Sequence, residues 1–360
     1  MILPTSYAIA LLLAVVALCC WGSWPSTFKL GRQRFELFYW DYALGVLLGA
    51  AAAAFTFGSL GFDVGGDVAG FAFYDDLMRA SKHSWAYAFG GGAVFNLGIL
   101  FLVASTSVAG MSLAFPVGLG LAATTALLLD YILKPHASAV LAFSAVALAL
   151  AAVLLNAAAY RALSLHRAHE AIKTGRTRST RVTASWRAVV LAAVGGPFLA
   201  LAFPLVEMSR DPDLGMGPYA GAFLFSLGMF VSTFLYNLFF MNVPVQGEPI
   251  EMLFYFRQPV ARHVLPLVGG LVTAAGTVAL FVASSAVTAV RPGVEPVPLL
   301  GPTTLHPVLL GAAALSGLWG LLVWKESADG SHRVHSLQVL MLGLLIAALA
   351  LVLVAPPFAR

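Results

Sequence analysis

The stretch GGAVFNLGILFL at residues 91–102 recurs in outline as GGLVTAAGTVAL at residues 269–280. Both follow the pattern G-G-x-V-x3-G-x3-L, and both lie inside long runs that hold no charged side chain. Over all 360 residues, 60% are hydrophobic, only 10% are charged, and the mean hydropathy is +0.89. A water-soluble protein cannot cover its surface with so few charged groups. The composition therefore predicts an all-α protein that spans a membrane, because helices satisfy their own backbone groups there.

Ten apolar segments are long enough to cross a bilayer, for which a helix needs about 20 residues. They cover residues 7–28, 38–57, 87–105, 112–132, 138–160, 188–206, 219–241, 264–287, 307–324 and 337–354. Loops after odd-numbered segments hold 14 Lys and Arg, against 6 in the even-numbered loops and the C-terminus. Because basic loops stay in the cytoplasm, both termini are expected outside a multi-pass protein of the plasma (inner) membrane.

The two halves of the chain match at further positions. The Trp-Pro pair at 24–25 matches Phe-Pro at 203–204, Tyr-Ala at 42–43 matches Tyr-Ala at 219–220, and PVGLGLAA from residue 116 matches PVLLGAAA from residue 307. The offsets are 179, 177 and 191 residues, against 178 for the glycine motif. These matches predict five-helix repeats at 1–160 and 188–360, joined by a basic cytoplasmic linker at 161–187. Since five crossings are an odd number, the second repeat is inverted relative to the first, as in many secondary transporters.

Four stretches carry a resemblance to a known family: CWGSWPSTFKL (20–30), RFELFYWDYALGVLL (34–48), FTFGSLG (55–61) and GGGAVFNLGILFLVASTSVAGMSLAFPVGLG (90–120). The sequence resembles the bacterial relatives of plant ureide permeases, beside the glucose/ribose porters in the drug/metabolite transporter superfamily. The resemblance implies two inverted five-helix bundles and alternating-access transport of small polar metabolites. Plant members carry a phosphate-binding loop in the central linker. The linker here lacks G-x4-G-K-[ST], so no nucleotide and no other cofactor is expected.

Neutral polar residues inside the spans are the candidates for solute binding. All 36 charged residues fall in loops or near span ends, which favours an uncharged solute of the ureide, sugar or nucleobase class. Trp24 and Thr27 flank Pro25, which opens the first helix, and an indole beside a hydroxyl suits a planar amide or a sugar ring. Asn96 and Asn237 offer amide donors and acceptors. The alternatives are an interfacial aromatic anchor for Trp24, favoured for Trp21, and helix–helix bridging for the two asparagines.

Asp41 is the candidate for binding a coupling ion, proton or sodium, near the cytoplasmic end of the second span. The alternative is that Asp41 caps the N-terminus of that helix. No metal site, nucleic-acid partner or catalytic cluster is expected, and the sequence leaves the oligomeric state open. Two other functions remain: a broad drug or metabolite exporter, and a membrane sensor or structural protein that moves no solute.

Overall fold

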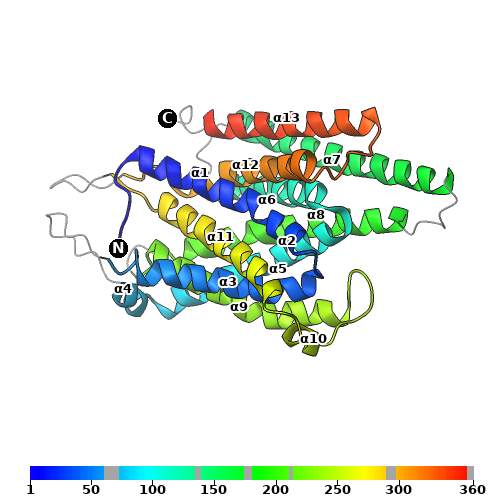
Figure 1. Cartoon of the computed structure of the whole chain (residues 1–360). Helices are drawn as coiled ribbons and strands as arrows, with labels where there is room; N and C mark the ends of the chain where they lie inside the picture. Colours follow the sequence, from blue (N-terminus) through cyan, green and yellow to red (C-terminus); the bar gives the residue numbers. More distant parts are fainter. Residues whose placement is uncertain (61–72, 134–138, 174–180, 211–213, 289–296, 355–360) are drawn as a thin grey trace. The chain divides into compact units, whose positions relative to one another are not determined.

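The computed structural model describes residues 1–60, 73–133, 139–173, 181–210, 214–288 and 297–354 (Figure 1). Within these ranges the structure is helical, apart from one isolated bridge between Val287 and Pro298. The elements are α1 (Tyr7–Ser23), α2 (Pro25–Gly31), α3 (Phe35–Phe55), α4 (Phe73–Arg79), α5 (Lys82–Ala109), α6 (Met111–Leu133), α7 (Ala139–Lys173), α8 (Arg181–Met208), α9 (Pro218–Asn242), α10 (Leu253–Phe256), α11 (Ala261–Ser284), η1 (Pro302–Thr304), α12 (Leu305–Leu318), η2 (Trp319–Val323) and α13 (His332–Val354).

Ten spans are present in the described residues, counting α1 with α2 and α12 with η2 as one span each. The predicted class, an all-α protein with ten membrane-crossing helices, is therefore confirmed. Several helices run past the apolar segments that predicted them. α5 begins at Lys82, and α7 continues to Lys173, so the first part of the predicted linker at 161–187 is helix. Residues 174–180 of that linker lie outside the described residues.

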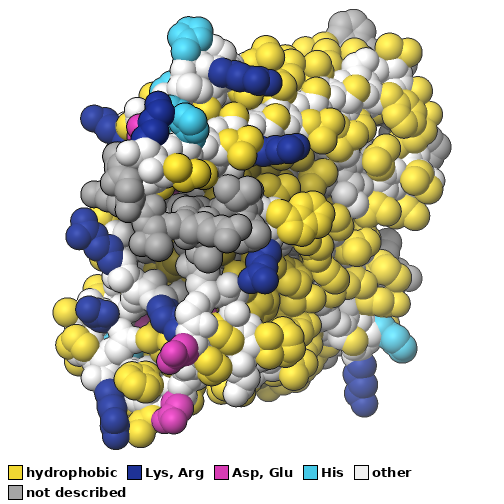
Figure 2. Space-filling model, turned by 90° about the vertical axis from the view of Figure 1, so that its right-hand side faces the viewer, with side chains coloured by type: hydrophobic (Ala, Val, Ile, Leu, Met, Phe, Trp, Pro, Cys, Tyr) yellow, Lys and Arg dark blue, Asp and Glu magenta, His cyan; other side chains and the backbone are white. Residues whose placement is uncertain are grey.

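Large apolar side chains stay exposed on the spans, which is the arrangement that a hydrocarbon solvent favours. Leu154, Leu235 and Val339 are each more than two-thirds exposed, and Figure 2 shows a face on which hydrophobic side chains predominate. Such a surface would be a liability in water, where large apolar patches cause association. The protein therefore resides in a lipid bilayer.

The first span is broken at Pro25, as its position predicts. α1 ends at Ser23 and α2 starts with the proline, whose missing N–H suits the first turn of a helix. The Thr27 hydroxyl donates to the Trp24 carbonyl oxygen over 2.7 Å, and the Thr27 backbone N–H donates to the same oxygen. The break therefore leaves this carbonyl satisfied by Thr27.

A single residue joins α5 to α6. Gly110 has φ of +92°, a conformation that L side chains rarely adopt. The Glu326 carboxylate lies against this turn and accepts hydrogen bonds from the N–H groups of Met111 and Ser112 over 3.0 and 2.8 Å. A carboxylate at a helix N-terminus satisfies exposed donors and is favoured by the helix dipole. The turn is thus fixed by one glycine and one acidic side chain.

The helices form two compact units, and each unit takes helices from both halves of the sequence. Unit 1 comprises Met1–Asn96, Leu201–Pro244 and Pro249–Val308, and unit 2 comprises Leu97–Ala200, Val245–Glu248 and Leu309–Arg360. The division falls inside α5, α8 and α12, so these three helices contribute to each unit. The predicted repeats at 1–160 and 188–360 are a different division, based on sequence similarity.

The glycines of the repeated motif lie where another helix passes too close for a side chain. A Cβ on Gly92 would stand 1.8 Å from the Phe225 carbonyl oxygen, and one on Gly270 would stand 2.1 Å from the Tyr42 carbonyl oxygen. The other motif glycines also face a neighbouring helix: Gly91 faces Val206, Gly269 faces Thr27, Gly98 faces Leu199 and Gly276 faces Cys20. Small residues at these positions let membrane helices approach closely.

These contacts recur at constant offsets along the chain. The motif glycines are 178 residues apart, and their partners on the first and sixth spans (Thr27 with Val206, Cys20 with Leu199) are 179 apart. The matched residues on α3 and α9 are 183 positions apart: Tyr42 corresponds to Phe225, and Gly45 corresponds to Gly228. Gly45 faces Leu267 on α11, as Gly228 faces Phe89 on α5. The match of Tyr42-Ala43 with Tyr219-Ala220 at 177 is therefore wrong by six residues. It is a coincidence in an alanine-rich chain.

Candidate functional site

A buried polar network crosses unit 1 where α3, α5 and α9 meet. The Tyr39 hydroxyl donates to Asn96 Oδ1 over 2.7 Å, and Asn96 Nδ2 donates to the hydroxyls of Ser232 and Thr233 over 2.9 and 3.1 Å. Tyr39, Asn96 and Thr233 are fully buried. In the repeat register Asn96 and Ser232 correspond to Ala274 and Gly49, which also contact each other. A hydrogen bond between α5 and α9 thus stands where the matched contact between α11 and α3 has small apolar atoms.

The side-chain amide of Asn96 already makes hydrogen bonds to other side chains of the protein. Both amide hydrogens and the carbonyl oxygen have side-chain partners on α3 and α9. This arrangement is the helix-bridging alternative that the sequence left open. A role for Asn96 in solute binding stays a prediction, and it would require exchange of one of these bonds.

Five buried side-chain polar atoms in unit 1 have no hydrogen-bond partner among the described residues. They are Tyr42 Oη, Ser226 Oγ and Asn237 Oδ1, together with Trp40 Nε1 and Gln258 Oε1. Thr273 lies near the Tyr42 hydroxyl without meeting hydrogen-bond geometry. Asn237 uses only its Nδ2, which donates to the Glu36 carbonyl oxygen over 2.8 Å. Buried polar groups without a partner are rare in proteins and call for a specific explanation.

Trp24 and Trp21 are buried against other aromatic rings of unit 1. Trp24 is 2% exposed and stacks on Tyr42, with ring centroids 4.5 Å apart. Trp21 is 3% exposed, lies between Phe95 and Phe203, and donates from Nε1 to the Thr277 hydroxyl. An interfacial anchor must reach the headgroup region, so the anchor interpretation is wrong for both. The helix break at Pro25 turns this segment inward instead.

Asp41 lies two turns inside α3 and is not a helix cap. The helix begins at Phe35, with Arg34 in the capping position, so the capping alternative is wrong. Its carboxylate instead accepts from the Tyr255 hydroxyl on α10 over 2.5 Å, and its other oxygen is 2.8 Å from His263 Nδ1 on α11. The Asp41 side chain is 8% exposed and that of His263 is 26% exposed. Asp41 thus lies against both a phenol and an imidazole.

Sequence patterns did not single out Tyr39, Tyr255 or His263. Each lies in a segment that looks like ordinary span or loop, and Tyr255 and His263 are more than 200 residues from Asp41. The repeat register is the signal that could have found His263, because the corresponding residue in the first half is Trp85. His263 is ionisable whereas Trp85 is not, so this matched position differs in chemistry between the two halves of the chain.

Comparisons with known proteins establish the fold and name no function. No family model matches the chain, and no curated protein matches it. A solved structure described only as "Crystal structure of protein" is similar, with a TM-score of 0.55 and 16% sequence identity, over 98% of this chain and 99% of that chain. At this identity the likeness shows the fold alone. The fold therefore has a precedent among solved structures.

Proposed function

We propose that this protein is a permease that carries a small, uncharged polar metabolite of the ureide, sugar or nucleobase class across the membrane. The observation that carries the proposal is that buried polar atoms of α3 and α9 have no protein partner among the described residues, above all Tyr42 Oη, Ser226 Oγ and Asn237 Oδ1. An unpaired polar group costs free energy in an apolar interior unless a ligand or water satisfies it. These groups are neutral and include donors and acceptors, which suits an amide or a hydroxyl.

The repeated glycine contacts support the second part of the proposal, inverted five-helix repeats that work by alternating access. Gly92 and Gly270 occupy matched positions and face matched carbonyl oxygens on α9 and α3. Two copies of one helix arrangement, related by inversion, can form equivalent inward- and outward-facing states. The resemblance to ureide permease relatives in the drug/metabolite transporter superfamily supports the same mechanism.

The experiment is a thermal-stability screen of the purified protein with allantoin, nucleobases, hexoses and pentoses, and with lipophilic cations for comparison. Uptake of the stabilising solute into proteoliposomes follows. We expect at least one of these solutes to raise the melting temperature and to be taken up. Stabilisation by lipophilic cations alone would favour an exporter, and binding without flux would favour a sensor. Either result would contradict the proposal, as would no response to any solute in the panel.

Tyr42→Phe tests whether the unpaired hydroxyl contacts the solute. The change keeps the ring that stacks on Trp24 and removes only the oxygen, so the fold should survive. Losing one hydrogen bond to a neutral ligand should weaken binding roughly tenfold. Ser105→Ala is the control, because that buried hydroxyl already donates to the Ala188 carbonyl oxygen in unit 2. Unchanged affinity in Tyr42→Phe would remove Tyr42 from the site.

A further inference from the structure

The two copies of the repeat differ in chemistry where α3 meets the start of α11. In the register set by the glycine contacts, Asp41 corresponds to Leu224 and His263 corresponds to Trp85. The short helices α10 and α4 each precede the repeated glycine span, and the offset of 178 pairs Tyr255 with Leu77. Three polar side chains in one copy therefore stand where the other has leucine, tryptophan and leucine.

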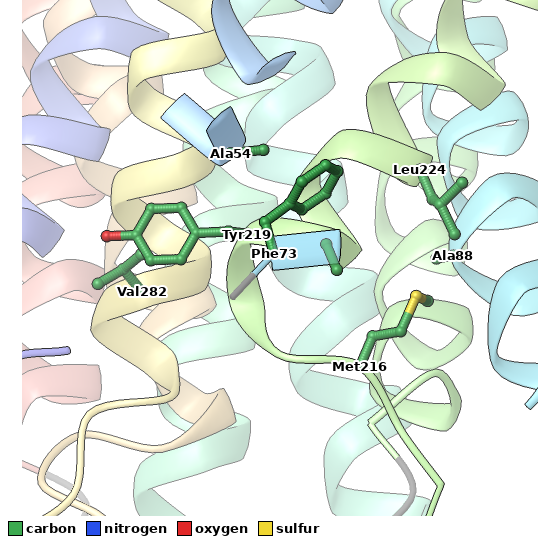
Figure 3. Close-up of a cluster of buried hydrophobic side chains, with 8 residues drawn as sticks. Ala54, Phe73, Ala88, Met216, Tyr219, Leu224 and Val282 are labelled. Carbon is green, nitrogen blue, oxygen red and sulfur yellow. The ribbon is translucent and has the colours of Figure 1, made fainter. Parts of the chain in front are cut away.

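The other copy has apolar side chains at these three positions, and the buried Asp76 on its α4 has a different role, because it accepts hydrogen bonds from the Gly217 N–H over 3.0 and 3.1 Å. Leu224 belongs to a buried hydrophobic cluster with Met216 and Tyr219 (Figure 3). Trp85 and Leu77 pack against that cluster. Placing an acid and a histidine at the matching positions costs desolvation, which apolar side chains avoid. Ionisable groups inside membrane helices are expensive and usually serve a function. Asp41 and His263 are therefore not explained by packing.

The geometry of the pair fixes how many protons it holds. One proton lies between Asp41 Oδ2 and His263 Nδ1, which are 2.8 Å apart. His263 Nε2 is the remaining site for a second proton, and taking it up changes the charge of the pair from −1 to zero. The partly exposed imidazole gives protons a route to the enclosed carboxylate. The exposed Arg257 and Arg262 mark this edge as the water-facing one.

The donors around Asp41 favour a proton over a sodium ion. Each carboxylate oxygen already faces a donor, the Tyr255 hydroxyl on Oδ1 and the His263 imidazole on Oδ2. A hard cation needs several oxygen ligands converging on one point, and an imidazole is a poor ligand for it. Burial, and then the hydrogen bond to Asp41, raise the pKa of Tyr255, so its hydroxyl remains a donor. Tyr255 thus orients Asp41 and does not itself titrate.

We infer that Asp41 and His263 form a proton-binding pair, positioned by Tyr255, that couples a proton gradient to the transport proposed above. The inference rests on that proposed function and adds the identity of the driving ion. The other titratable groups on the surrounding helices are few among the described residues. On α3, Glu36 is paired with Arg34 over 2.8 Å, and α2, which packs against α11, carries Lys29. α9 carries no charged side chain, and its tyrosines are Tyr219 and Tyr236. Proton binding near Asp41 is therefore assigned to this pair.

The first experiment follows proton binding without any solute. Protein labelled with 15N in its eight histidines is titrated by NMR over about pH 5 to 8, the range in which histidine titrates. His263→Gln identifies the His263 signal, and Asp41→Asn should shift its titration. His83→Gln and Asp75→Asn, at exposed positions on α5 and α4, are the matched controls and should leave it unchanged. A His263 signal that does not titrate in this range, or that ignores Asp41→Asn, would overturn the inference.

The second experiment uses the solute identified in the screen and an inward-directed pH gradient across proteoliposomes. One pH unit is worth about 1.36 kcal/mol per proton, so one coupled proton should drive about tenfold accumulation. The triple variant Asp41→Leu, His263→Trp, Tyr255→Leu copies the apolar repeat and should fold, equilibrate the solute and accumulate none. Tyr255→Phe should retain accumulation with a displaced pH profile.

The outcomes separate the two proposals. Uptake that equilibrates in the wild type and ignores the pH gradient overturns the coupling and leaves the permease intact. Accumulation by the triple variant equal to that of the wild type also overturns the coupling. If no solute in the panel is taken up, the permease proposal fails and the coupling with it, whatever the NMR titration shows.

Discussion

Asn96 and Asn237 are the same residue type in the same unit, yet the protein uses them differently. Asn96 has side-chain partners for both amide hydrogens and for its oxygen, whereas Asn237 leaves its oxygen unpaired. A residue whose polar atoms are satisfied is explained by the fold, and one whose atoms are not requires a ligand. At the residue scale, Asn237 is therefore the stronger candidate for solute contact.

Ser226 and Ser105 are both fully buried serines and form a matched pair for measuring this difference. Ser226 Oγ has no partner among the described residues, whereas Ser105 Oγ donates to the Ala188 carbonyl oxygen over 2.8 Å. Without solute, Ser226→Ala should stabilise the protein by about 1 kcal/mol, because it removes an unsatisfied group. Ser105→Ala should cost about 1 kcal/mol. Thermal unfolding in detergent measures both, and an equal loss in the two variants would contradict the assignment of Ser226.

The glycines at the crossing of α3 and α11 set how closely these elements approach. A Cβ on Gly270 would meet the Tyr42 carbonyl oxygen, the Val46 nitrogen and the Gly45 Cα, all of which are backbone atoms that cannot move aside cheaply. Gly270→Ala should therefore destabilise the protein by about 1–3 kcal/mol. Gly343 on α13 has no atom within 4 Å of the added Cβ, so Gly343→Ala should stabilise by up to about 1 kcal/mol. The melting temperatures should move in opposite directions; a rise in both would exclude the close approach.

The long extension of α7 is tied to the segment after η2 by an ion pair whose strength depends on pH. Arg167 binds the Asp329 carboxylate through two hydrogen bonds of 2.6 and 2.7 Å, and these hold the pKa of Asp329 below its usual range. A lowered carboxyl pKa contributes stability above the usual pKa, and this stability is lost as pH falls through the lowered value. Because Asp329 is 56% exposed, Asp329→Asn should cost less than about 1 kcal/mol at pH 7. The difference in melting temperature from the wild type should shrink towards pH 3, and a constant difference would contradict it.

At the scale of the helices, the sequence predicted the elements that appear as continuous apolar runs. Apolar runs located all ten spans, because a membrane helix must be apolar over its whole crossing. The ends of the helices were predicted less well. The apolar run of the fifth span ends at residue 160, but α7 continues through Arg161 to Lys173, where the residues are polar and hydropathy does not indicate a helix. The register between α3 and α9 was also missed, since only contacts such as Gly45 with Leu267 reveal it.

For the whole molecule, the distribution of basic residues predicts that both termini lie outside. A cysteine-free background, with Cys19 and Cys20 replaced by alanine, allows single cysteines to be placed at exposed ends of α7 and α5. Lys173→Cys should react with an impermeant maleimide only from the cytoplasmic side, and Lys82→Cys only from outside. The opposite pattern would reverse the orientation and place Asp41 at the other face.

The candidate site was predictable only in part, because a sequence shows which residues lie in each helix but not which residues of different helices come into contact. Trp24, Thr27, Asn96 and Asn237 all fall in unit 1, and so does Asp41. The polar residue types were sufficient to select them. Their partners Tyr39, Tyr255 and His263 depend on how α3, α5, α10 and α11 come together, and no local pattern encodes that.

The one-residue turn at Gly110 has a consequence for how the protein is made. Because α6 follows α5 with no connecting loop, the two helices lie beside each other at this end as soon as both have crossed the bilayer. Glu326, synthesised more than 200 residues later, can seal the turn only after both are in place. An epitope tag inserted at residue 110, on the side expected to be cytoplasmic, should therefore leave both helices inserted but lower the melting temperature, because it separates Glu326 from the N–H groups that it seals.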